Sequence, residues 1–232
     1  MKIIPKILDH IHLKYHLKKI EKYINKHFNS SINVIFDVGC YKGSFIDICL
    51  NIYKSNFNIY AFEAEKKIYE KLNHYKSYSN INIYNFGISD QDTLLDLNIS
   101  YQEGTSTFSF LNDASKYLTF KSNILGEKIF LKKEKVEVQK IDSFCLKKNI
   151  KKIDFLKIDT EGHEMSVLLG AEKLIKNIKI ILIEFSFHDM YLNYDNKKIE
   201  NFLIKNNFRL AECFKTPFQK WEDRIYINEV FF

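Results

Sequence analysis

Short apolar runs and stretches with an apolar residue every three or four positions alternate along most of this chain. The short runs are typical of buried strands, and the wider spacing is typical of amphipathic helices. Repeated strand–helix units of this kind predict an α/β fold with a doubly wound, mostly parallel sheet, closed at one edge by an antiparallel pair. The predicted strands are 34–36, 59–62, 81–86, 155–158, 178–185, 208–214 and 224–231, with helices at 44–53, 65–76, 195–206 and after Gly162.

A long insertion is predicted between the third strand and the strand at 155–158. Residues 93–100 and 134–141 alternate as half-buried strands do. The passage between them, 102–123, is rich in Ser, Thr and Asn, but it carries too many apolar residues for a disordered loop. We interpret it as a substrate-facing insertion with a short helix near 114–120.

The N-terminal segment predicts a helix that carries most of the net positive charge. Apolar residues recur at helical intervals over 3–28, and residues 1–28 hold seven lysines against Asp9 and Glu21, which gives +5 of the net +6. The lysines can be the solvated face of a helical lid, or a basic surface that contacts an anionic membrane or an acidic partner. We therefore divide the chain into a basic helical extension, 1–31, and one domain, 32–232.

Composition narrows the class of protein. The 232 residues are 46% hydrophobic and 28% charged, which suits an α/β domain with a sizeable core. Charge beyond residue 28 is nearly balanced, so no nucleic-acid-binding surface is expected across the whole protein. The four cysteines are far apart and include no C-x-x-C pair, which fits free thiols in a reducing cytosol. No apolar run approaches the roughly 18 residues that span a bilayer, so we expect a cytoplasmic protein, and we expect no metal site.

A glycine-bearing loop follows the first strand, within VIFDVGCYKGSF at 34–45. Such a loop, leading into a helix, brings backbone N–H groups and the positive helix end to the strand tip. Gly39 would let the backbone pass close to a ligand, and Asp37 would fix the loop or hold a polar ligand group. The stretch lacks the G-x-G-x-x-G of dinucleotide folds and the G-K-[ST] of phosphate loops, and it can also be a plain strand–helix joint.

Polar residues follow other predicted strands at the same edge of the sheet. Glu63 follows the second strand, where a carboxylate can accept both hydroxyls of a ribose, and Ser89 and Asp90 follow the third. Asp159 and Glu161 follow the strand at 155–158 and can hold a cationic or hydroxyl-bearing ligand or accept a proton. These side chains are expected around one crevice, because ligands bind at the carboxyl ends of parallel strands.

Two of these assignments have simpler alternatives. Glu161 and Glu164 can merely favour the N-terminal end of the following helix. His188 comes just after the apolar strand 178–185, and its ordinary pKa would suit a general base. A single histidine is, however, more often structural.

The chain contains six motifs, which follow one another in this order: FDVGCYKGSF (36–45), YAFEAE (60–65), GISDQ (87–91), EGTSTFSF (103–110), FLKIDTEGHEMSVLLGA (155–171) and IEF (183–185). Together they resemble the FkbM family of S-adenosylmethionine-dependent methyltransferases, over about 33–190, and K-I-D-x-E-G-x-E is the most specific part. The resemblance implies a class I methyltransferase fold, which is Rossmann-like with a seven-stranded sheet whose last strand is antiparallel.

The resemblance also implies roles for individual residues. The loop after the first strand would wrap the methionine end of S-adenosylmethionine, Glu63 would hold the ribose, and Asp159 would lie beside the amino-acid moiety or the reacting hydroxyl. The family commonly has Asn where this chain has Tyr41. The implied cofactor-binding residues are Asp37, Gly39, Cys40, Tyr41, Gly43, Glu63, Ala64, Ser89, Asp90 and Asp159, and the implied acceptor-side residues are Thr105 and Ser106, where the family often has serines.

We therefore expect a S-adenosylmethionine-dependent O-methyltransferase that acts on a hydroxyl of a sugar, glycan precursor or similar small molecule. The protein would mainly align the acceptor oxygen with the methyl group, and a base would take the proton, with His188, Asp159 and Glu161 as candidates in falling order. A non-catalytic nucleotide-binding or scaffolding module on the same fold is one alternative. A nicotinamide-dependent oxidoreductase is another, although its G-x-G-x-x-G is absent. The acceptor and the oligomeric state stay open.

Overall fold

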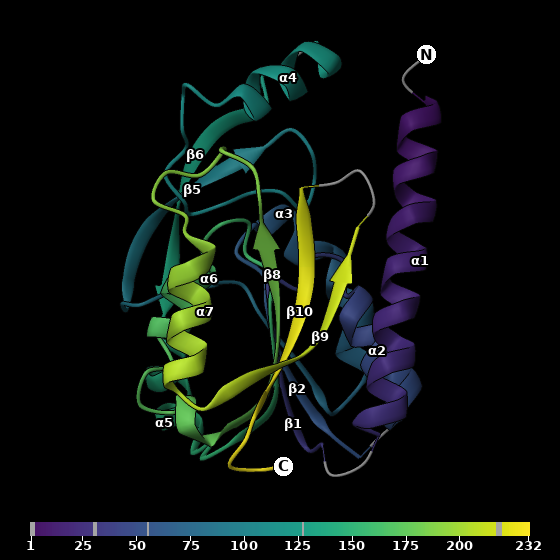
Figure 1. Cartoon of the computed structure of the whole chain (residues 1–232), viewed down its shortest axis with the longest axis vertical. Coiled ribbons are helices and arrows are strands. Elements are labelled where there is room, and N and C mark those ends of the chain that lie inside the picture. The colour runs from purple at the N-terminus through teal and green to yellow at the C-terminus, as the bar shows by residue number, and fades with distance from the viewer. Residues whose placement is uncertain (1–2, 30–31, 55, 127, 217–219) are drawn as a thin grey trace.

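A seven-stranded sheet forms the centre of the molecule, with helices on both faces (Figure 1). The structure is a computed structural model that describes residues 3–29, 32–54, 56–126, 128–216 and 220–232. All neighbouring strands pair in parallel except β10 with its two partners. This arrangement confirms the doubly wound, mostly parallel sheet. The strand order is β3 (Ile81–Tyr84), β2 (Asn58–Phe62), β1 (Val34–Val38), β7 (Ile153–Ile158), β8 (Ile178–Ser186), β10 (Trp221–Asn228) and β9 (Phe208–Lys215).

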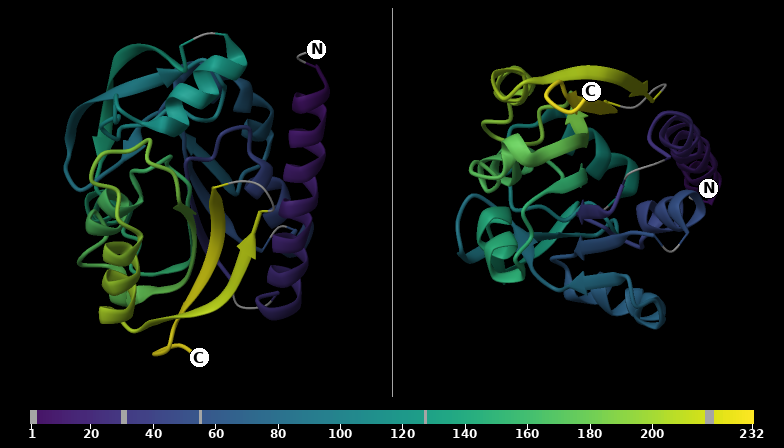
Figure 2. Two further views of the ribbon diagram at one scale, coloured as in Figure 1. Left: turned by 45° about the horizontal axis from the view of Figure 1, so that its top comes forward. Right: turned by 90° about the horizontal axis from the view of Figure 1, so that it is seen from below.

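Two apolar clusters, one on each face of the sheet, join the strands to the helices that cover them. The central strands are therefore buried on both faces. The layers are visible end-on in the right-hand view of Figure 2. Phe144 and Leu203 pack in one cluster, and Ile24 and Ile46 pack in the other. The first face carries α5 (Ile141–Lys148), α6 (Glu164–Leu169), the 3-10 helix η2 (Ile175–Asn177) and α7 (Asn196–Lys205), and the second carries α1 (Ile3–His27), α2 (Ser44–Tyr53), α3 (Lys66–Tyr69) and the 3-10 helix η1 (Glu70–Ser77).

The N-terminal helix is packed onto the sheet layer along its second half. Ile20 and Ile24 of α1 are buried in the second apolar cluster, and the Tyr23 hydroxyl donates to the Ala211 carbonyl oxygen in β9 (3.3 Å). The division of the chain at residue 31 stays a prediction. Among the described residues, no helix combines the length and the apolar character needed to cross a membrane.

A second, three-stranded sheet is the main element that the sequence did not predict as a unit. It has the order β4 (Gly87–Ile88), β6 (Phe130–Gln139) and β5 (Thr93–Ser100), and β5 and β6 are antiparallel. The predicted helix near 114–120 is present as α4 (Lys116–Leu125). This helix lies at the same end of the molecule as the N-terminal end of α1 (Figure 1).

Other differences from the predicted elements are small shifts at their ends. The helix predicted at 65–76 is α-helical only in α3 and continues as η1. There the Tyr75 hydroxyl donates to the Gly43 carbonyl oxygen (3.1 Å) and to Asp47 Oδ1 (2.7 Å), which fixes the segment against α2. The strand predicted at 134–141 is β6, which ends at Gln139, because Ile141 already begins α5.

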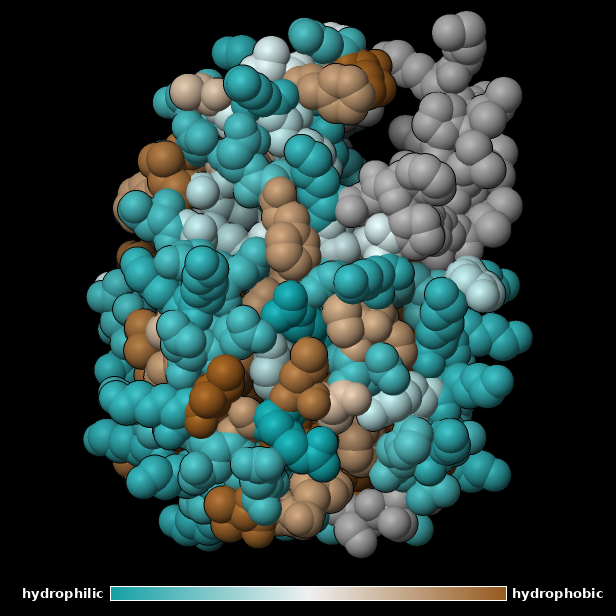
Figure 3. Space-filling model, viewed as in Figure 1, coloured by the Kyte–Doolittle hydropathy of each residue, from teal (hydrophilic) through white to brown (hydrophobic). Residues whose placement is uncertain are grey.

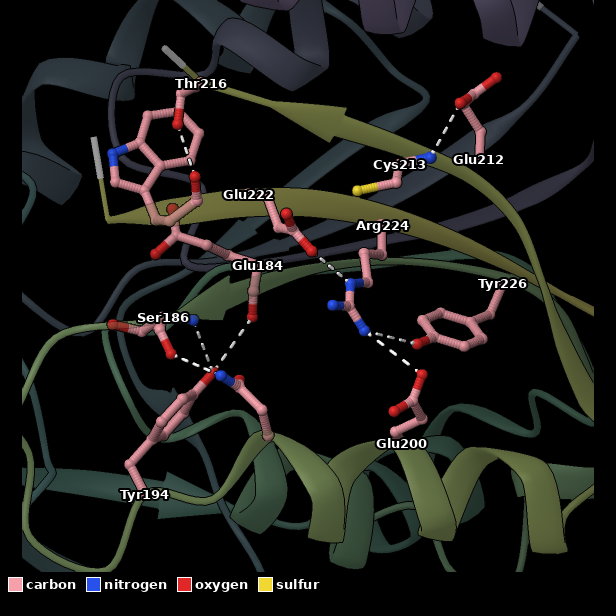
Figure 4. Close-up of polar contacts among 12 residues, drawn as sticks. Glu184, Ser186, Tyr194, Glu200, Glu212, Cys213, Thr216, Glu222, Arg224 and Tyr226 are labelled. Atoms are coloured by element: carbon pink, nitrogen blue, oxygen red, sulfur yellow. Dashed lines mark hydrogen bonds and ion pairs between the residues drawn. The ribbon is translucent and has the colours of Figure 1, made fainter. Parts of the chain in front are cut away.

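Polar contacts attach α7 to the antiparallel edge of the sheet (Figure 4). The Arg224 guanidinium in β10 donates to Glu222 (2.6 Å) and to Glu200 of α7 (3.4 Å), and it lies 4.1 Å from the centroid of the Phe185 ring. Nearby, the Ser186 N–H donates to the Tyr194 hydroxyl (3.1 Å). These contacts fix the C-terminal end of β8.

The tips of β1 and β7 are joined by a buried ion pair. The two strands pair Asp37 directly with Lys157, and Lys157 Nζ lies 3.3 Å from Asp37 Oδ1 and 3.3 Å from Asp159 Oδ2. It also donates to the Gly39 carbonyl oxygen (2.9 Å). Burial alone would lower the pKa of Lys157, but Asp159 and Asp37 outweigh it and raise that pKa, so the lysine stays protonated.

We expect Lys157→Met to lower the free energy of unfolding by about 3–5 kcal/mol, because it leaves the fully buried Asp37 carboxylate without its counter-charge. Urea denaturation followed by circular dichroism measures this. Adding Asp37→Asn should restore most of the loss, since it removes the stranded charge as well. Lys152→Met removes a half-exposed partner of Asp154, which has Lys179 as a second partner, and should cost less than about 1 kcal/mol. Equal stability of Lys157→Met and the unchanged protein would contradict the assignment.

Candidate active site

A cleft of about 850 Å³ opens at the C-terminal ends of β1, β2, β7 and β8. This is the edge where the sequence places its polar strand tips, and the size is that of a small-molecule or cofactor site. The predicted site residues divide into two groups. Gly39, Cys40, Tyr41, Glu63, Ala64, Thr105, Ser106, Asp159, Glu161 and His188 line the cleft, whereas Asp37, Gly43, Ser89 and Asp90 do not.

The loop after β1 is shaped by a close approach of two strand tips. A Cβ atom on Gly39 would lie 1.9 Å from the Asp159 carbonyl oxygen, and Gly39 has φ +77°. Only glycine fits both conditions. Tyr41 also has a positive φ of 48°, and its ring lies against Gly104 of the insertion. The loop therefore keeps its backbone at the cleft surface, and Tyr41 is covered by the insertion.

Glu63 ties this loop to the end of β2. Its carboxylate accepts from the Tyr41 N–H (2.9 Å) and from the Glu65 N–H (2.8 Å), one on each oxygen. The side chain is 9% exposed, and burial raises its pKa to about 7 against the opposing effect of the two N–H donors. Each oxygen keeps one lone pair for a further donor, so the residue can accept two hydroxyl groups from the cleft.

Ser89 is buried and contacts Asp90, which is exposed, directly after β4. The Ser89 hydroxyl lies 3.0 Å from Asp90 Oδ1 and 2.9 Å from His163 Nε2. Burial lowers the pKa of His163 to about 4, so its ring is neutral near pH 7. Gly87 and Ile88 line the cleft, whereas Ser89, Asp90 and His163 lie outside its lining.

Polar side chains of the insertion hold it against the loop after β1 and against η1. Glu103 forms ion pairs with Lys42 (2.9 Å) and Lys71 (2.5 Å), which lower the pKa of Glu103 to about 2. The Ser106 hydroxyl donates to Glu65 Oε2 (2.8 Å), and the Thr105 hydroxyl donates within the insertion. Thr105 and Ser106 thus lie next to the Glu63 end of the cleft, with their hydroxyls already engaged.

A turn after β7 presents Glu161 to the cleft. Glu161 has a positive φ of 55°, which is rare for a non-glycine residue and marks a strained site. The Tyr191 hydroxyl donates to its carboxylate (2.5 Å), and Gly162 leaves room for that ring. Burial, followed by the nearby Asp159 charge, raises the pKa of Glu161 to about 7. Glu184, which also lines the cleft, has its pKa raised by burial and then by Asp159.

His188 lies in an aromatic stack on the other side of the cleft. Its ring is stacked on Tyr117 (centroids 4.5 Å apart) and packs edge-on against Tyr191. The Met190 N–H points to Nδ1 (3.4 Å), so Nε2 carries the proton and donates to Ser186 Oγ (2.9 Å). Burial and the charge of Lys121 lower the pKa of His188 to about 4. Both ring nitrogens are occupied, and the ring is a weak base.

Several residues of the cleft were missed by sequence reasoning. Lys157 stands within the K-I-D motif, and a lysine inside an otherwise apolar strand is a signal that could have identified it. His16 of α1 gave no usable signal. It is buried and lies 2.7 Å from Asp223 Oδ2, and it packs edge-on against Trp221, so α1 and β10 form one wall of the cleft together.

The N-terminal end of α4 is tethered to the loop after β8. Asp189 accepts from the Ser115 hydroxyl (2.7 Å) and from the Lys116 N–H (2.9 Å), and Ser115 caps the helix through the Leu118 N–H (3.0 Å). Through these contacts α4 forms a further wall of the cleft. In the part of the chain that the structure describes, no three His, Cys, Asp or Glu side chains are grouped to hold a metal ion.

Comparison with known proteins places this arrangement in a family. The model of the methyltransferase FkbM domain matches residues 37–210, which is more than half of the chain. The methyltransferase FkbM from Methylobacillus flagellatus KT shares the fold, with a TM-score of 0.54 and 16% identity. The alignment covers 84% of this chain and 43% of that one, so the present chain spans less than half the length of that protein.

Two further solved structures align with TM-scores of 0.49. A putative RNA methyltransferase from Pyrococcus horikoshii is 8% identical, with 91% of this chain and 82% of that chain covered. Precorrin-6y C5,15-methyltransferase from Geobacter metallireducens GS-15 is 9% identical, with 90% and 87% covered. No curated protein matches the chain.

The family match confirms the resemblance seen in the sequence, and with it the class I methyltransferase fold and S-adenosylmethionine as the cofactor of this fold. It begins at Asp37 in the β1 tip and ends at Leu210 in β9. Because that span contains the glycine loop, Glu63 and the turn that presents Glu161, we conclude that the chain belongs to the FkbM methyltransferase family.

Proposed function

We propose that this protein transfers a methyl group from S-adenosylmethionine to a hydroxyl of a sugar, a glycan precursor or a similar small molecule. The observation that carries the proposal is Glu161, a carboxylate in the cleft whose pKa of about 7 suits proton removal at neutral pH. The near balance of charge beyond residue 28 supports a small acceptor rather than a nucleic acid.

The residues at one end of the cleft fit the cofactor. Glu63 keeps free lone pairs for two ribose hydroxyls, and Gly39 lets the backbone approach the methionine end. Asp159, half-exposed beside Lys157, offers a carboxylate for the amino group. The bound cofactor supplies a sulfonium methyl that is already strongly electrophilic, so the protein has to orient the acceptor and remove its proton.

Glu161 performs the proton transfer in this mechanism. Its carboxylate would take the proton of the acceptor hydroxyl, so that the oxygen could accept the methyl group that the bound cofactor would supply. Tyr191 orients the carboxylate through its 2.5 Å hydrogen bond. His188, the first candidate from sequence, serves better as a neutral packing group against Tyr117, because both of its nitrogens are engaged.

Titration calorimetry with S-adenosylhomocysteine tests the cofactor site through its pH dependence. Ribose hydroxyls donate to the ionised Glu63 and lower its pKa, so binding below pH 7 requires loss of a proton. We expect micromolar binding at pH 8 and roughly tenfold weaker binding at pH 6. Glu63→Gln should bind more weakly and lose most of this slope, whereas Glu161→Gln should keep it. Absence of binding by the folded, unchanged protein would refute the proposed function and favour a scaffolding module.

Glu161→Gln should lower turnover by about 10²–10⁴-fold with the affinity for S-adenosylhomocysteine retained. Methyl transfer from radiolabelled S-adenosylmethionine to a panel of sugars, nucleotide sugars and glycosyl phosphates provides the assay. Turnover by the unchanged protein should rise with pH through about 7, because only the ionised carboxylate accepts the proton. His188→Asn is the matched control and should lose less than about tenfold. If His188→Asn loses more than Glu161→Gln, histidine is the base instead.

A further inference from the structure

Three lysines from two distant segments line the cleft near Tyr117. Lys116 and Lys121 belong to α4, Lys220 immediately precedes β10, and all three line the cleft. The ammonium groups of Lys121 and Lys220 lie 5.2 Å and 6.0 Å from the centroid of the same ring, that of Tyr117. The cleft therefore has a positively charged mouth built around one aromatic side chain.

None of these lysines forms an ion pair with a described residue, although Lys121 lowers the pKa of Glu161 and therefore lies within electrostatic reach of that cleft carboxylate. Two of the cleft carboxylates face other cations, since Asp159 lies beside Lys157 and Asp223 lies beside His16. Gathering like charges without a partner costs free energy, and a bound anion removes that cost. The mouth is thus complementary to a negatively charged group.

The position of the lysines relative to Glu161, the proposed base, determines how far the charged group of the acceptor lies from its reacting hydroxyl. Tyr191 donates to Glu161 and contacts the His188 ring (centroids 5.0 Å apart), and His188 stacks on Tyr117 (4.5 Å). One aromatic stack therefore separates Glu161 from the lysines around Tyr117. An acceptor whose hydroxyl reaches Glu161 places a neighbouring substituent of its sugar ring at the lysines.

We propose that the acceptor is a phosphate ester of a sugar, and that Lys116, Lys121 and Lys220 bind its phosphate. This inference rests on the proposed function. Lysine ammonium groups act as point charges that suit the tetrahedral phosphate. The phosphate itself takes no part in the chemical step. It fixes the sugar so that one hydroxyl lies at Glu161.

The surface beside the lysines indicates one source of such a phosphate. Phe120 and Ile124 are 62% and 61% exposed and follow Lys116 at four-residue intervals on one face of α4. Figure 3 shows apolar residues gathered over this helix at the upper end of the molecule. An apolar face next to a phosphate site suits a sugar phosphate that is linked to a lipid.

The first experiment titrates glucose, galactose, mannose and N-acetylglucosamine 1-phosphates, each against its free sugar, with and without S-adenosylhomocysteine. We expect at least one phosphate to bind tenfold or more tightly than its sugar. A triple variant, Lys116→Gln, Lys121→Gln and Lys220→Gln, should lose this preference and keep its affinity for S-adenosylhomocysteine. The triple change of the exposed Lys76, Lys133 and Lys176 to Gln removes the same charge elsewhere and should change neither value.

Equal binding of phosphates and free sugars, or a preference that survives in the triple variant, would overturn the proposal. Because S-adenosylhomocysteine binding is measured separately, its absence would refute the proposed function without touching the phosphate site. A second arm presents polyprenyl-phosphate-linked glucose in phosphatidylcholine vesicles to Phe120→Ser with Ile124→Ser. Loss of binding to these vesicles only, with glucose 1-phosphate unaffected, identifies a lipid-linked acceptor. Failure of the unchanged protein to bind these vesicles, with glucose 1-phosphate bound, identifies a free sugar phosphate.

Discussion

The Lys157 ammonium group, held between Asp37 and Asp159, is the interaction on which the site depends. It neutralises a fully buried carboxylate in the centre of the sheet, and it also draws the β1 and β7 tips together. The tips meet so closely that only Gly39 fits beside the Asp159 carbonyl oxygen. The glycine loop is therefore a consequence of how a buried charge is satisfied, as well as an adaptation to the cofactor.

Burial gives the other carboxylates of the cleft their chemistry. Glu63, Glu161 and Glu164 each have a pKa raised to about 7, and desolvation is the largest cause for all three. Glu164 shows the structural use of such a group. One of its oxygens accepts from the N–H groups of Thr160 and Gly162, which fixes the turn that presents Glu161. A carboxylate that shapes the turn thus lies next to one that faces the cleft.

The sequence predicted the central sheet well because its strands are buried on both faces and are therefore continuous apolar runs. It also predicted the cleft edge, since Glu63, Asp159 and Glu161 directly follow such runs. What it could not predict comes from contacts between distant segments. The pairing of β5 with β6, the approach of His16 to Asp223 across the chain, and the occupied ring nitrogens of His188 leave no local pattern.

The two ends of the cleft are built from different parts of the fold. The cofactor end is built from strand tips, where most substitutions disturb the core. The end where we propose that the acceptor binds is lined by residues of α1 and α4 and by Lys220, and α4 is held to the loop after β8 through Asp189. Under the proposed function, substitutions in α4 or at Lys220 would therefore alter the choice of acceptor while the tips of β1, β2 and β7 stay as they are.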